Sequence, residues 1–251
     1  MRIGGYSKLT LQDYPGQVAA ICFTVGCQLR CPYCHNAELA LSDEVNNNAG
    51  AEDLTAEFLS YLEKRKEQLD GVVISGGEPL LQNDLQDFLF AIKKMGLKVK
   101  LDTNGFLSEK LKKIIDLKLA DYVALDFKNC RQYLAETVGW SEPERQGVID
   151  TYYNNWLESL ANLRKNNIPF ELRTTVVREL HSFEALQQMA TTICDGECSR
   201  EPWFLQSFVK NRGILCDVTK KGNTDLSSYS GGEMEAMRLV LLQQVPAIQC
   251  R

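Results

Sequence analysis

Hydrophobic positions in this chain fall into short runs, which alternate with longer stretches where apolar residues recur every three or four positions. Short apolar runs between turns are typical of strands buried on both faces, and the wider spacing is typical of amphipathic helices. The runs predict strands at 18–24, 71–75, 97–102, 122–127, 170–177 and 203–208. The stretches predict helices at 55–69, 84–95, 108–117, 148–166, 182–194 and 230–245.

This alternation predicts an α/β fold, because right-handed crossovers bring successive strands into one parallel sheet. Six units are too few for a closed eight-stranded barrel, so we expect a partial, TIM-like (β/α)6 barrel. We predict a single domain over 1–251, with a core at about 17–210, an N-terminal extension at 1–16 and a C-terminal helical segment at 211–251. Chemistry in such barrels takes place at the C-terminal ends of the strands.

Local signals refine the boundaries of these elements. Ser108 is expected to cap a helix, and Gly96 is expected to end one. Ser230-Gly-Gly-Glu233 precedes a helical pattern and follows no strand, so it predicts an N-cap with an acidic first turn. The segments 41–52 and 129–147 are predicted to be irregular.

Composition narrows the class of protein. The chain has 251 residues, 44% of them hydrophobic, and a net charge of −5. The lysines of 93–100 and 110–113 are expected on solvated faces, so nucleic acid is not expected as a direct partner. Because no run of about 18 apolar residues and no secretion signal occur, we expect no membrane association and a cytoplasmic location. The nine cysteines are expected to be reduced thiols or metal ligands.

Three cysteines follow the first predicted strand as Cys27-x3-Cys31-x2-Cys34. Cysteine thiolates are the usual ligands of iron–sulfur clusters, and three of them leave one iron of a cubane open for chemistry. Half of a zinc site is an alternative, but it requires a second ligand pair at similar spacing. A thioredoxin-like Cys-x2-Cys is another alternative, and it would leave Cys27 without a role.

A second motif, Ser75-Gly-Gly-Glu-Pro-Leu80, follows the second predicted strand, and Gly76 lies 42 positions after Cys34. Glycines let the backbone approach a ligand closely, and the carboxylate of Glu78 suits an ammonium group. The two motifs together resemble the radical S-adenosylmethionine (SAM) superfamily. In that superfamily the open iron chelates SAM, and one electron cleaves the sulfonium to a 5′-deoxyadenosyl radical.

The resemblance implies roles for individual residues of both motifs. Cys27, Cys31 and Cys34 would hold a [4Fe-4S] cluster and make up the catalytic centre. Glu78, with Gly76, Gly77 and Pro79, would bind the amino group of SAM. Tyr33 would lie against the adenine, with loop packing as its alternative role, and His35 and Asn36 would lie beside the adenine.

Two further strand ends, Asp102-Thr-Asn-Gly-Phe106 and Asp126-Phe-Lys128, resemble glycyl-radical-enzyme activating enzymes. The resemblance implies that Asp102, Thr103, Asn104, Asp126 and Lys128 contact the ribose and carboxylate of SAM. It also implies a monovalent cation on Asp102, Thr103 and Asp126. Arg173 is expected either to face the SAM carboxylate or to form a salt bridge with a neighbouring acid.

The N-terminal run from Ile3 to Gly16, together with the cysteine loop, is similar to the activating proteins of anaerobic ribonucleoside-triphosphate reductase. The implied reaction removes a hydrogen atom from a glycine of a partner glycyl radical enzyme. The electron would come from reduced flavodoxin or a ferredoxin-type donor. The match is clear over 1–128 and loose beyond, and it leaves a pyruvate formate-lyase-type enzyme open as the partner.

Two alternative functions belong to other classes. A radical SAM enzyme acting on a small molecule, such as a 7-carboxy-7-deazaguanine synthase-like protein, would respond to a metabolite rather than to a protein. A non-enzymatic iron–sulfur carrier would have no need of Glu78. A second metal on Cys130, Cys194, Cys198 and Cys216 is also an alternative, although ordinary thiols are the simpler interpretation.

Overall fold

A computed structural model describes residues 1–45, 54–140, 146–194, 200–210, 213–219 and 225–251. The chain divides into two compact units that alternate along the sequence. Unit 1 comprises 1–28, 38–124 and 155–169, and unit 2 comprises 29–37, 125–154 and 170–251. No helix in the described ranges is long and apolar enough to cross a membrane.

Unit 1 is built on four strands that stand in sequence order. They are β1 (Ile3–Thr10), β2 (Ala19–Thr24), β3 (Gly71–Gly76) and β4 (Lys98–Thr103). The strands β2, β3 and β4 are parallel, and β1 pairs with β2 in the antiparallel sense. The segment expected to be an N-terminal extension is therefore largely a strand. A fifth strand, β5 (Tyr122–Asp126), leads from unit 1 into unit 2.

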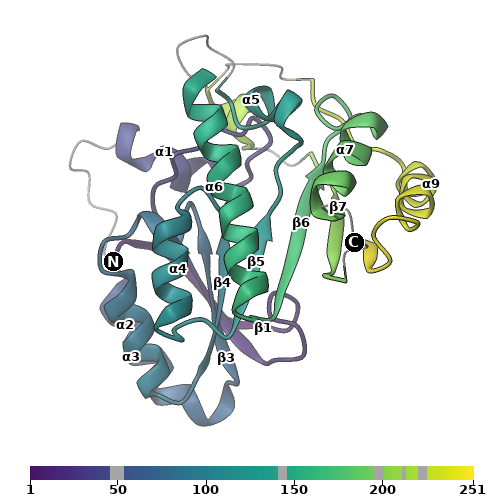
Figure 1. Cartoon of the computed structure of the whole chain (residues 1–251). Helices are drawn as coiled ribbons and strands as arrows, with labels where there is room; N and C mark the ends of the chain where they lie inside the picture. The colour runs from purple at the N-terminus through teal and green to yellow at the C-terminus, as the bar shows by residue number, and fades with distance from the viewer. Residues whose placement is uncertain (46–53, 141–145, 195–199, 211–212, 220–224) are drawn as a thin grey trace. The chain divides into compact units, whose positions relative to one another are not determined.

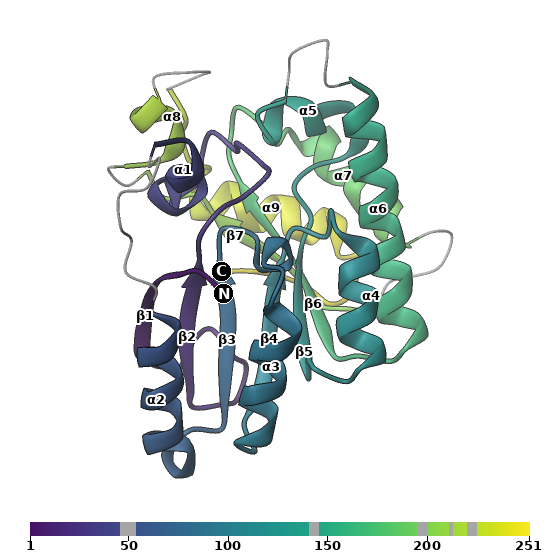
Figure 2. The ribbon, with the colours of Figure 1, turned by 90° about the vertical axis from the view of Figure 1, so that its left-hand side faces the viewer.

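Helices α2, α3 and α4 follow the strands of unit 1, and α2 and α3 stand against one face of them (Figure 2). Their bounds are α2 (Thr55–Arg65), with the short 3-10 helix η1 (Lys66–Gln68), then η2 (Pro79–Leu81), α3 (Leu85–Lys94) and α4 (Ser108–Asp116). The predicted apolar stripe of α3 is buried, at Leu85, Phe88, Leu89 and Ile92. Gly96 follows the helix with φ +83°, which confirms it as the residue that ends α3.

Unit 2 contains three parallel strands, β6 (Phe170–Val176), β7 (Trp203–Ser207) and β8 (Ile248–Cys250). Helices α7 (Phe183–Cys194) and α9 (Gly231–Leu241) contact each other, and α9 also contacts β7 and β8 (Figure 1). The remaining elements are η3 (Arg131–Tyr133), α5 (Leu134–Thr137) and α8 (Leu215–Thr219). Helix α6 (Gln146–Lys165) begins in unit 2 and ends in unit 1.

The six predicted strands are present to within one residue at each end, and β1 and β8 were missed. Helix α1 (Ala37–Val45) corrects the irregular prediction for 41–52, because Ala37, Ala40 and Leu41 are buried at helical spacing. Helices η3 and α5 likewise occupy part of 129–147, and the remaining parts of both segments, 46–53 and 141–145, lie outside the described residues.

Two predictions about helix ends were wrong. Ser108 is a helical residue rather than a cap, and its hydroxyl donates to Glu158 over 2.7 Å. The C-terminal helix ends at Leu241, four residues short of the predicted Val245. The predicted cap at Ser230 is confirmed, since the Ser230 hydroxyl accepts from the Glu233 N–H and the Glu233 side chain accepts from the Ser230 N–H.

Candidate functional site

The two glycines at the end of β3, Gly76 and Gly77, allow unit 1 to bring two backbone segments together. Gly76 has φ +112°, and a Cβ there would lie 2.2 Å from the backbone nitrogen of Thr24. A Cβ on Gly77 would lie 2.0 Å from the carbonyl oxygen of Gly26. The N–H of Gly77 donates to Thr24 O and the N–H of Glu78 donates to Gly26 O, over 2.9 and 2.8 Å. Only glycine fits here, and the result is that Glu78 is fixed beside the start of the cysteine loop.

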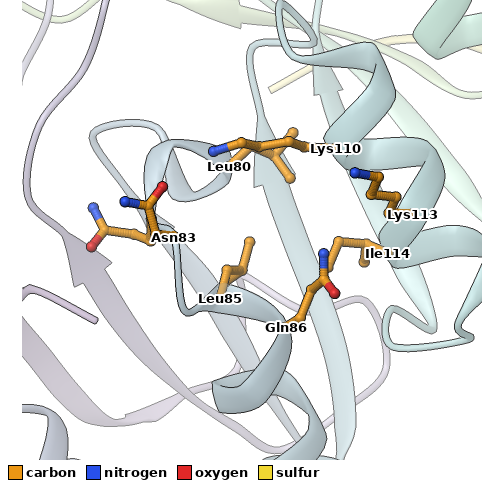
Figure 3. A pocket seen from close by; sticks show the side chains of 8 residues that line it. Leu80, Asn83, Leu85, Gln86, Lys110, Lys113 and Ile114 are labelled. Carbon is orange, nitrogen blue, oxygen red and sulfur yellow. The ribbon is translucent and has the colours of Figure 1, made fainter.

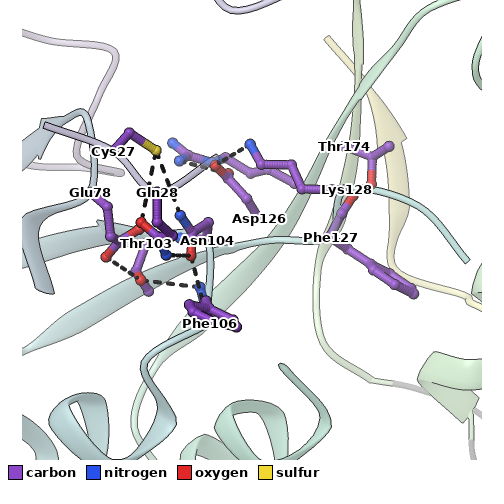
Figure 4. A network of polar contacts seen from close by, with 12 residues as sticks. Cys27, Gln28, Glu78, Thr103, Asn104, Phe106, Asp126, Phe127, Lys128 and Thr174 are labelled. Carbon is purple, nitrogen blue, oxygen red and sulfur yellow. Dashed lines mark hydrogen bonds and ion pairs between the residues drawn. The ribbon is translucent and has the colours of Figure 1, made fainter. Parts of the chain in front are cut away.

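The carboxylate of Glu78 is buried, with 1% of the residue exposed, and three neutral groups donate to it. The Thr103 hydroxyl donates to Oε1 and the Asn104 N–H donates to Oε2, each over 2.8 Å (Figure 4). The Leu80 N–H donates to Oε1 over 3.1 Å. Neutral donors stabilise a carboxylate without cancelling its charge. Glu78 is thus a buried carboxylate held in place by hydrogen bonds, and a carboxylate is chemically suited to bind an ammonium group.

Asn104 connects this carboxylate to the first cysteine. Its side-chain amide donates to Cys27 Sγ over 4.0 Å, and its Oδ1 accepts from the Gln28 side chain over 3.2 Å (Figure 4). Its Oδ1 also accepts from the Phe106 N–H over 3.0 Å, which closes the turn after β4. The predicted carboxylate and the predicted cluster ligand thus meet at one residue within unit 1.

Cys31 and Cys34 belong to unit 2, where backbone contacts hold their part of the loop. The N–H of Cys34 donates to Cys31 O, and the first residues of α8 donate to the loop: Leu215 N–H to Cys34 O and Cys216 N–H to Pro32 O, each over 3.0 Å. Burial raises the pKa of Cys31 to about 11 and also raises the pKa of Cys34. Both sulfurs are therefore thiols at neutral pH, and binding of a metal would release their protons.

Asp126 is the centre of a charged cluster at the end of β5. Lys128 Nζ lies 2.9 Å from Asp126 Oδ2, and the Arg173 guanidinium donates to Oδ1 through Nε over 3.0 Å (Figure 4 shows the lysine contact). Burial alone would raise the pKa of Asp126, but Arg173 and Lys128 together lower it to about 2. Arg173 thus forms the salt bridge expected as one of its two roles. Two cationic side chains thus lie at the end of β5, and cationic groups are chemically suited to bind an anionic ligand group.

His181 is a site residue that the sequence interpretation missed. It is fully buried; its Nδ1 accepts from the Val177 N–H over 3.1 Å, so its Nε2 carries the proton and donates to Lys128 O over 2.7 Å. Burial lowers its pKa to about 4. His181 therefore fixes the backbone of Lys128. A lone histidine after a strand is only a weak signal in a sequence.

The residues expected around the adenine have well-defined surroundings in unit 2. Tyr33 is buried and lies edge-on to the His181 ring, with 6.3 Å between centroids. The His35 ring stacks on Phe208 at 5.8 Å, and its Nε2 donates to Val209 O over 2.8 Å. The N–H of Asn36 donates to the sulfur of Cys34, which counteracts part of the rise in the pKa of Cys34. Contact with an adenine stays a prediction for all three.

The residues expected to hold a monovalent cation are engaged inside their own units. Asp102 Oδ1 lies 3.2 Å from Nζ of Lys100, and Lys100 is 2% exposed. This position corrects the prediction that the lysines of 93–100 are all solvated. The Thr103 hydroxyl donates to Glu78 and accepts from the Gly105 N–H over 3.1 Å. Pro79 is buried and begins the turn η2, and its part in binding SAM stays a prediction.

The cysteines outside the loop are held by other contacts. Cys194 Sγ donates to Gln244 O over 3.1 Å, and Cys130 and Cys216 are buried. Cys198 lies outside the described residues. Within the described ranges, no three His, Cys, Asp or Glu side chains gather as metal ligands, and every described cysteine is a free thiol. The second metal on these four cysteines and the cluster on Cys27, Cys31 and Cys34 therefore both stay predictions.

A separate pocket of about 120 Å³ lies between the start of α3 and helix α4 in unit 1. Figure 3 shows that Lys110 and Lys113 of α4 flank it opposite Asn83. Its lining contains none of the predicted site residues. The candidate site is thus defined by the polar networks at the strand ends rather than by this pocket.

The sequence matches the family model described as Radical SAM superfamily over residues 21–188. A Methanocaldococcus jannaschii protein, MJ1227, which carries the name of a glycyl-radical enzyme activating enzyme, is 33% identical over 194 residues, or 77% of this chain and 75% of that protein. The pyruvate formate-lyase 1-activating enzyme of Escherichia coli is 31% identical over 179 residues, covering 70% of this chain and 68% of that enzyme.

Solved structures show the same fold at low sequence identity. Streptococcus suis SuiB bound to S-adenosylmethionine matches with a TM-score of 0.63 and 15% identity, over 92% of this chain and 49% of that one. A TYW1 structure with a lysine–pyruvate adduct matches with a TM-score of 0.54 and 12% identity, over 90% of this chain and 74% of that one. The expected α/β open partial barrel is confirmed. The chain belongs to the radical SAM superfamily and, within it, to the glycyl-radical-enzyme activating family.

Proposed function

We propose that this protein reductively cleaves SAM at a [4Fe-4S] cluster and places a radical on one glycine of a partner enzyme. The single observation that carries the proposal is Asn104. Its N–H donates to the Glu78 carboxylate and its side chain donates to Cys27, so a carboxylate suited to an ammonium lies next to a predicted cluster ligand. An iron–sulfur carrier has no use for that arrangement.

The charge of each site residue indicates which part of SAM it would bind. Glu78 would bind the amino group of SAM, while Lys128 and Arg173, which hold Asp126, would attract its carboxylate. Cys27, Cys31 and Cys34 would hold the cluster. When bound, the cluster and SAM would supply the chemistry: one electron would cleave SAM to methionine and a 5′-deoxyadenosyl radical, and that radical would take a hydrogen atom from the glycine Cα.

We propose anaerobic ribonucleoside-triphosphate reductase as the partner, supported by the N-terminal run and the cysteine loop. A pyruvate formate-lyase-type partner is the second candidate, supported by the similarity to the Escherichia coli activating enzyme. Reduced flavodoxin or a ferredoxin-type protein would supply the electron. Because every described cysteine is a free thiol, we place the reaction in the cytoplasm.

The deciding experiment is electron paramagnetic resonance on the reconstituted protein with SAM and reductant, mixed anaerobically with each candidate partner from the same source. We expect a doublet with the reductase that disappears when the partner's glycine is changed to alanine. A doublet with the lyase alone would transfer the assignment to the second candidate. No radical on either partner, together with rapid 5′-deoxyadenosine formation on adding a small metabolite, would contradict the proposal.

The cluster assignment has its own test. Cys31→Ala should reduce bound iron from about four per chain to near zero, because a cubane held by two thiolates is not retained. Cys194→Ala is the control, since its sulfur donates to a backbone carbonyl in unit 2. Iron content and visible absorption after anaerobic reconstitution are the measurements. Loss of about half the iron in Cys194→Ala would instead indicate a second cluster.

A further inference from the structure

Lys100 is a buried lysine with a fixed set of partners. It lies on β4 two positions before Asp102, so both side chains leave the same face of the strand. Its Nζ lies 3.2 Å from Asp102 Oδ1, donates to Asp13 O over 2.6 Å and lies 5.9 Å from the centroid of the Tyr122 ring. A buried ammonium is costly unless it is paired, so this set of contacts requires an explanation.

The loop between β1 and β2 closes over this ammonium. Asp13 supplies the accepting carbonyl, and the next residue, Tyr14, is buried against Ala19, Ile21 and Val73. The rings of Tyr14 and Tyr122 lie 6.0 Å apart, and the Gln17 N–H donates to Tyr14 O over 3.1 Å. The position of the Lys100 ammonium is therefore set by packed and hydrogen-bonded neighbours.

The three residues implied as ligands of a monovalent cation do not fit that role. Asp102 faces the Lys100 ammonium, and Asp126 faces Lys128 and Arg173 at 2.9 Å each. The Thr103 hydroxyl donates to Glu78, and its oxygen already accepts from the Gly105 N–H. An added cation beside Asp102 would meet a fixed positive charge, and like charges at such short range repel strongly in a buried site.

We propose that the Lys100 ammonium takes the place of a bound monovalent cation beside Asp102, so that the protein works without K⁺ or Na⁺. This inference rests on the proposed function, because it concerns the same SAM site. It makes Lys100 a positioning residue: it holds Asp102, and therefore the end of β4 from which Thr103 and Asn104 contact Glu78.

The test compares thermal unfolding of the full-length, cluster-reconstituted protein in KCl, NaCl and choline chloride at equal ionic strength. We expect no difference between the salts for the wild type. We expect Lys100→Met to melt several degrees lower and to be stabilised by K⁺ or Na⁺ over choline, because an ion that binds only the folded state raises its stability. Lys98→Met is the matched control, since Lys98 is an exposed lysine on the same strand.

A double variant keeps the test decisive if Lys100→Met folds poorly. Lys100→Met with Asp102→Asn also removes the negative charge that the ammonium compensates. Its melting temperature should therefore be higher than that of Lys100→Met and should be the same in all three salts. A double variant no more stable than Lys100→Met would overturn the proposal. So would a wild-type protein that K⁺ or Na⁺ stabilises over choline, with the response lost in Asp102→Asn.

Calorimetry provides a second readout. Wild-type affinity for SAM should be equal in KCl and choline chloride, and a tenfold or greater gain in KCl would contradict the inference. Neither readout needs a partner enzyme. A missing glycyl radical would therefore count against the proposed function alone, whereas a salt-dependent wild type would count against this inference alone.

Discussion

The chain contains the tripeptide Gly-Gly-Glu twice, and the two copies have unrelated roles. Gly76 and Gly77 have no room for a Cβ, whereas a Cβ on Gly231 or Gly232 would meet nothing within 4 Å. The glutamate of the first copy is buried under three neutral donors. The glutamate of the second is about half exposed: 43% of the Glu233 side chain is accessible, and it belongs to a capping box. The structural environment of each copy, and not its sequence, decides which glutamate can bind a ligand.

The electrostatics of the two glutamates differ in the same way. Arg178 donates to both carboxylate oxygens of Glu233 over 2.8 and 2.7 Å. Hydrogen bonds from Arg178 and then from Ser230 lower the pKa of Glu233 to about 2. Its charge is thus matched by a guanidinium at the surface. Among the donors to Glu78 are a hydroxyl and two amides, and these three groups are neutral.

The largest expected contrast comes from adding a methyl group to each copy. Gly77→Ala should destabilise the protein by more than about 3 kcal/mol, because the new Cβ meets backbone that cannot move aside. Gly232→Ala should stabilise it by up to about 1 kcal/mol, because alanine restricts the unfolded chain and suits a helix. Denaturant unfolding of the two variants is the measurement. Equal effects of the same sign would remove the distinction between the copies.

The next contrast removes one charge from each glutamate. Glu78→Gln should weaken SAM binding about 30-fold, equivalent to about 2 kcal/mol, while the cluster is retained. Glu233→Gln should leave SAM affinity unchanged, since its partners belong to α9 and the loop after β6. Calorimetry on both reconstituted proteins is the check. If the Glu78→Gln variant binds SAM with unchanged affinity, Glu78 does not bind the amino group of SAM.

A third prediction concerns His181, which lies close in sequence to Arg178, the partner of Glu233 in the second copy. Arg178 lies three residues before His181, whose carbonyl accepts from Tyr229 over 3.0 Å. Because the pKa of His181 in the folded state, about 4, lies below the value of about 6.5 for an exposed histidine, protonation favours unfolding. Stability from this group is fully present above about pH 6.5 and falls by up to about 1.4 kcal/mol for each pH unit down to about pH 4.

His181→Gln should therefore flatten the dependence of melting temperature on pH between about 7 and 5. Glu233→Gln is the control and should keep the wild-type slope in that range, since its carboxylate titrates at lower pH. If His181→Gln keeps the full wild-type slope, another group is responsible for it.

The smallest expected effect belongs to the cap of the second copy. Ser230→Ala should cost about 1 kcal/mol, the usual value of a lost N-cap, with no change in SAM affinity. Unfolding in urea and calorimetry would measure the two quantities. A loss of SAM affinity here would show that α9 contributes to the site, and the comparison of the two copies would need revision.

Much of this architecture could be predicted because local pattern and final environment agree. The buried strands and the apolar stripe of α3 carry their periodicity in the sequence, and Ser230 carries the cap signal of α9. Strands β1 and β8 were missed because edge strands have mixed polarity: Gly4, Ser7 and Lys8 break any apolar run in β1. Helix α1 was missed because the turn-forming residues that directly follow it in the sequence, at 46–50, led to an irregular prediction for 41–52.

A residue of the candidate site could be predicted only where it belongs to a short sequence motif. The glycines, Glu78 and Asn104 lie in two short motifs, and the structure gathers them. Lys100 was assigned to a solvated face because it stands in a lysine-rich stretch. The alternation Lys98-Val-Lys100-Leu-Asp102 places it on the same face as Asp102, which was the available signal. The partners of His181, Val177 and Lys128, lie in the segments that follow β6 and β5, and no local pattern contains such contacts.

The hydrogen bonds from α8 to the loop that carries Cys31 and Cys34 determine the stage of synthesis at which the cluster can be installed. The ribosome makes the three cysteines of the loop before it makes Leu215 and Cys216. The N–H groups of those two residues hold the loop. Synthesis proceeds at about 5–20 residues per second, so the thiols exist for roughly 10 to 40 seconds before the residues that hold their loop are made. Iron delivery should therefore follow synthesis of α8, and nascent chains stalled before α8 should not retain iron.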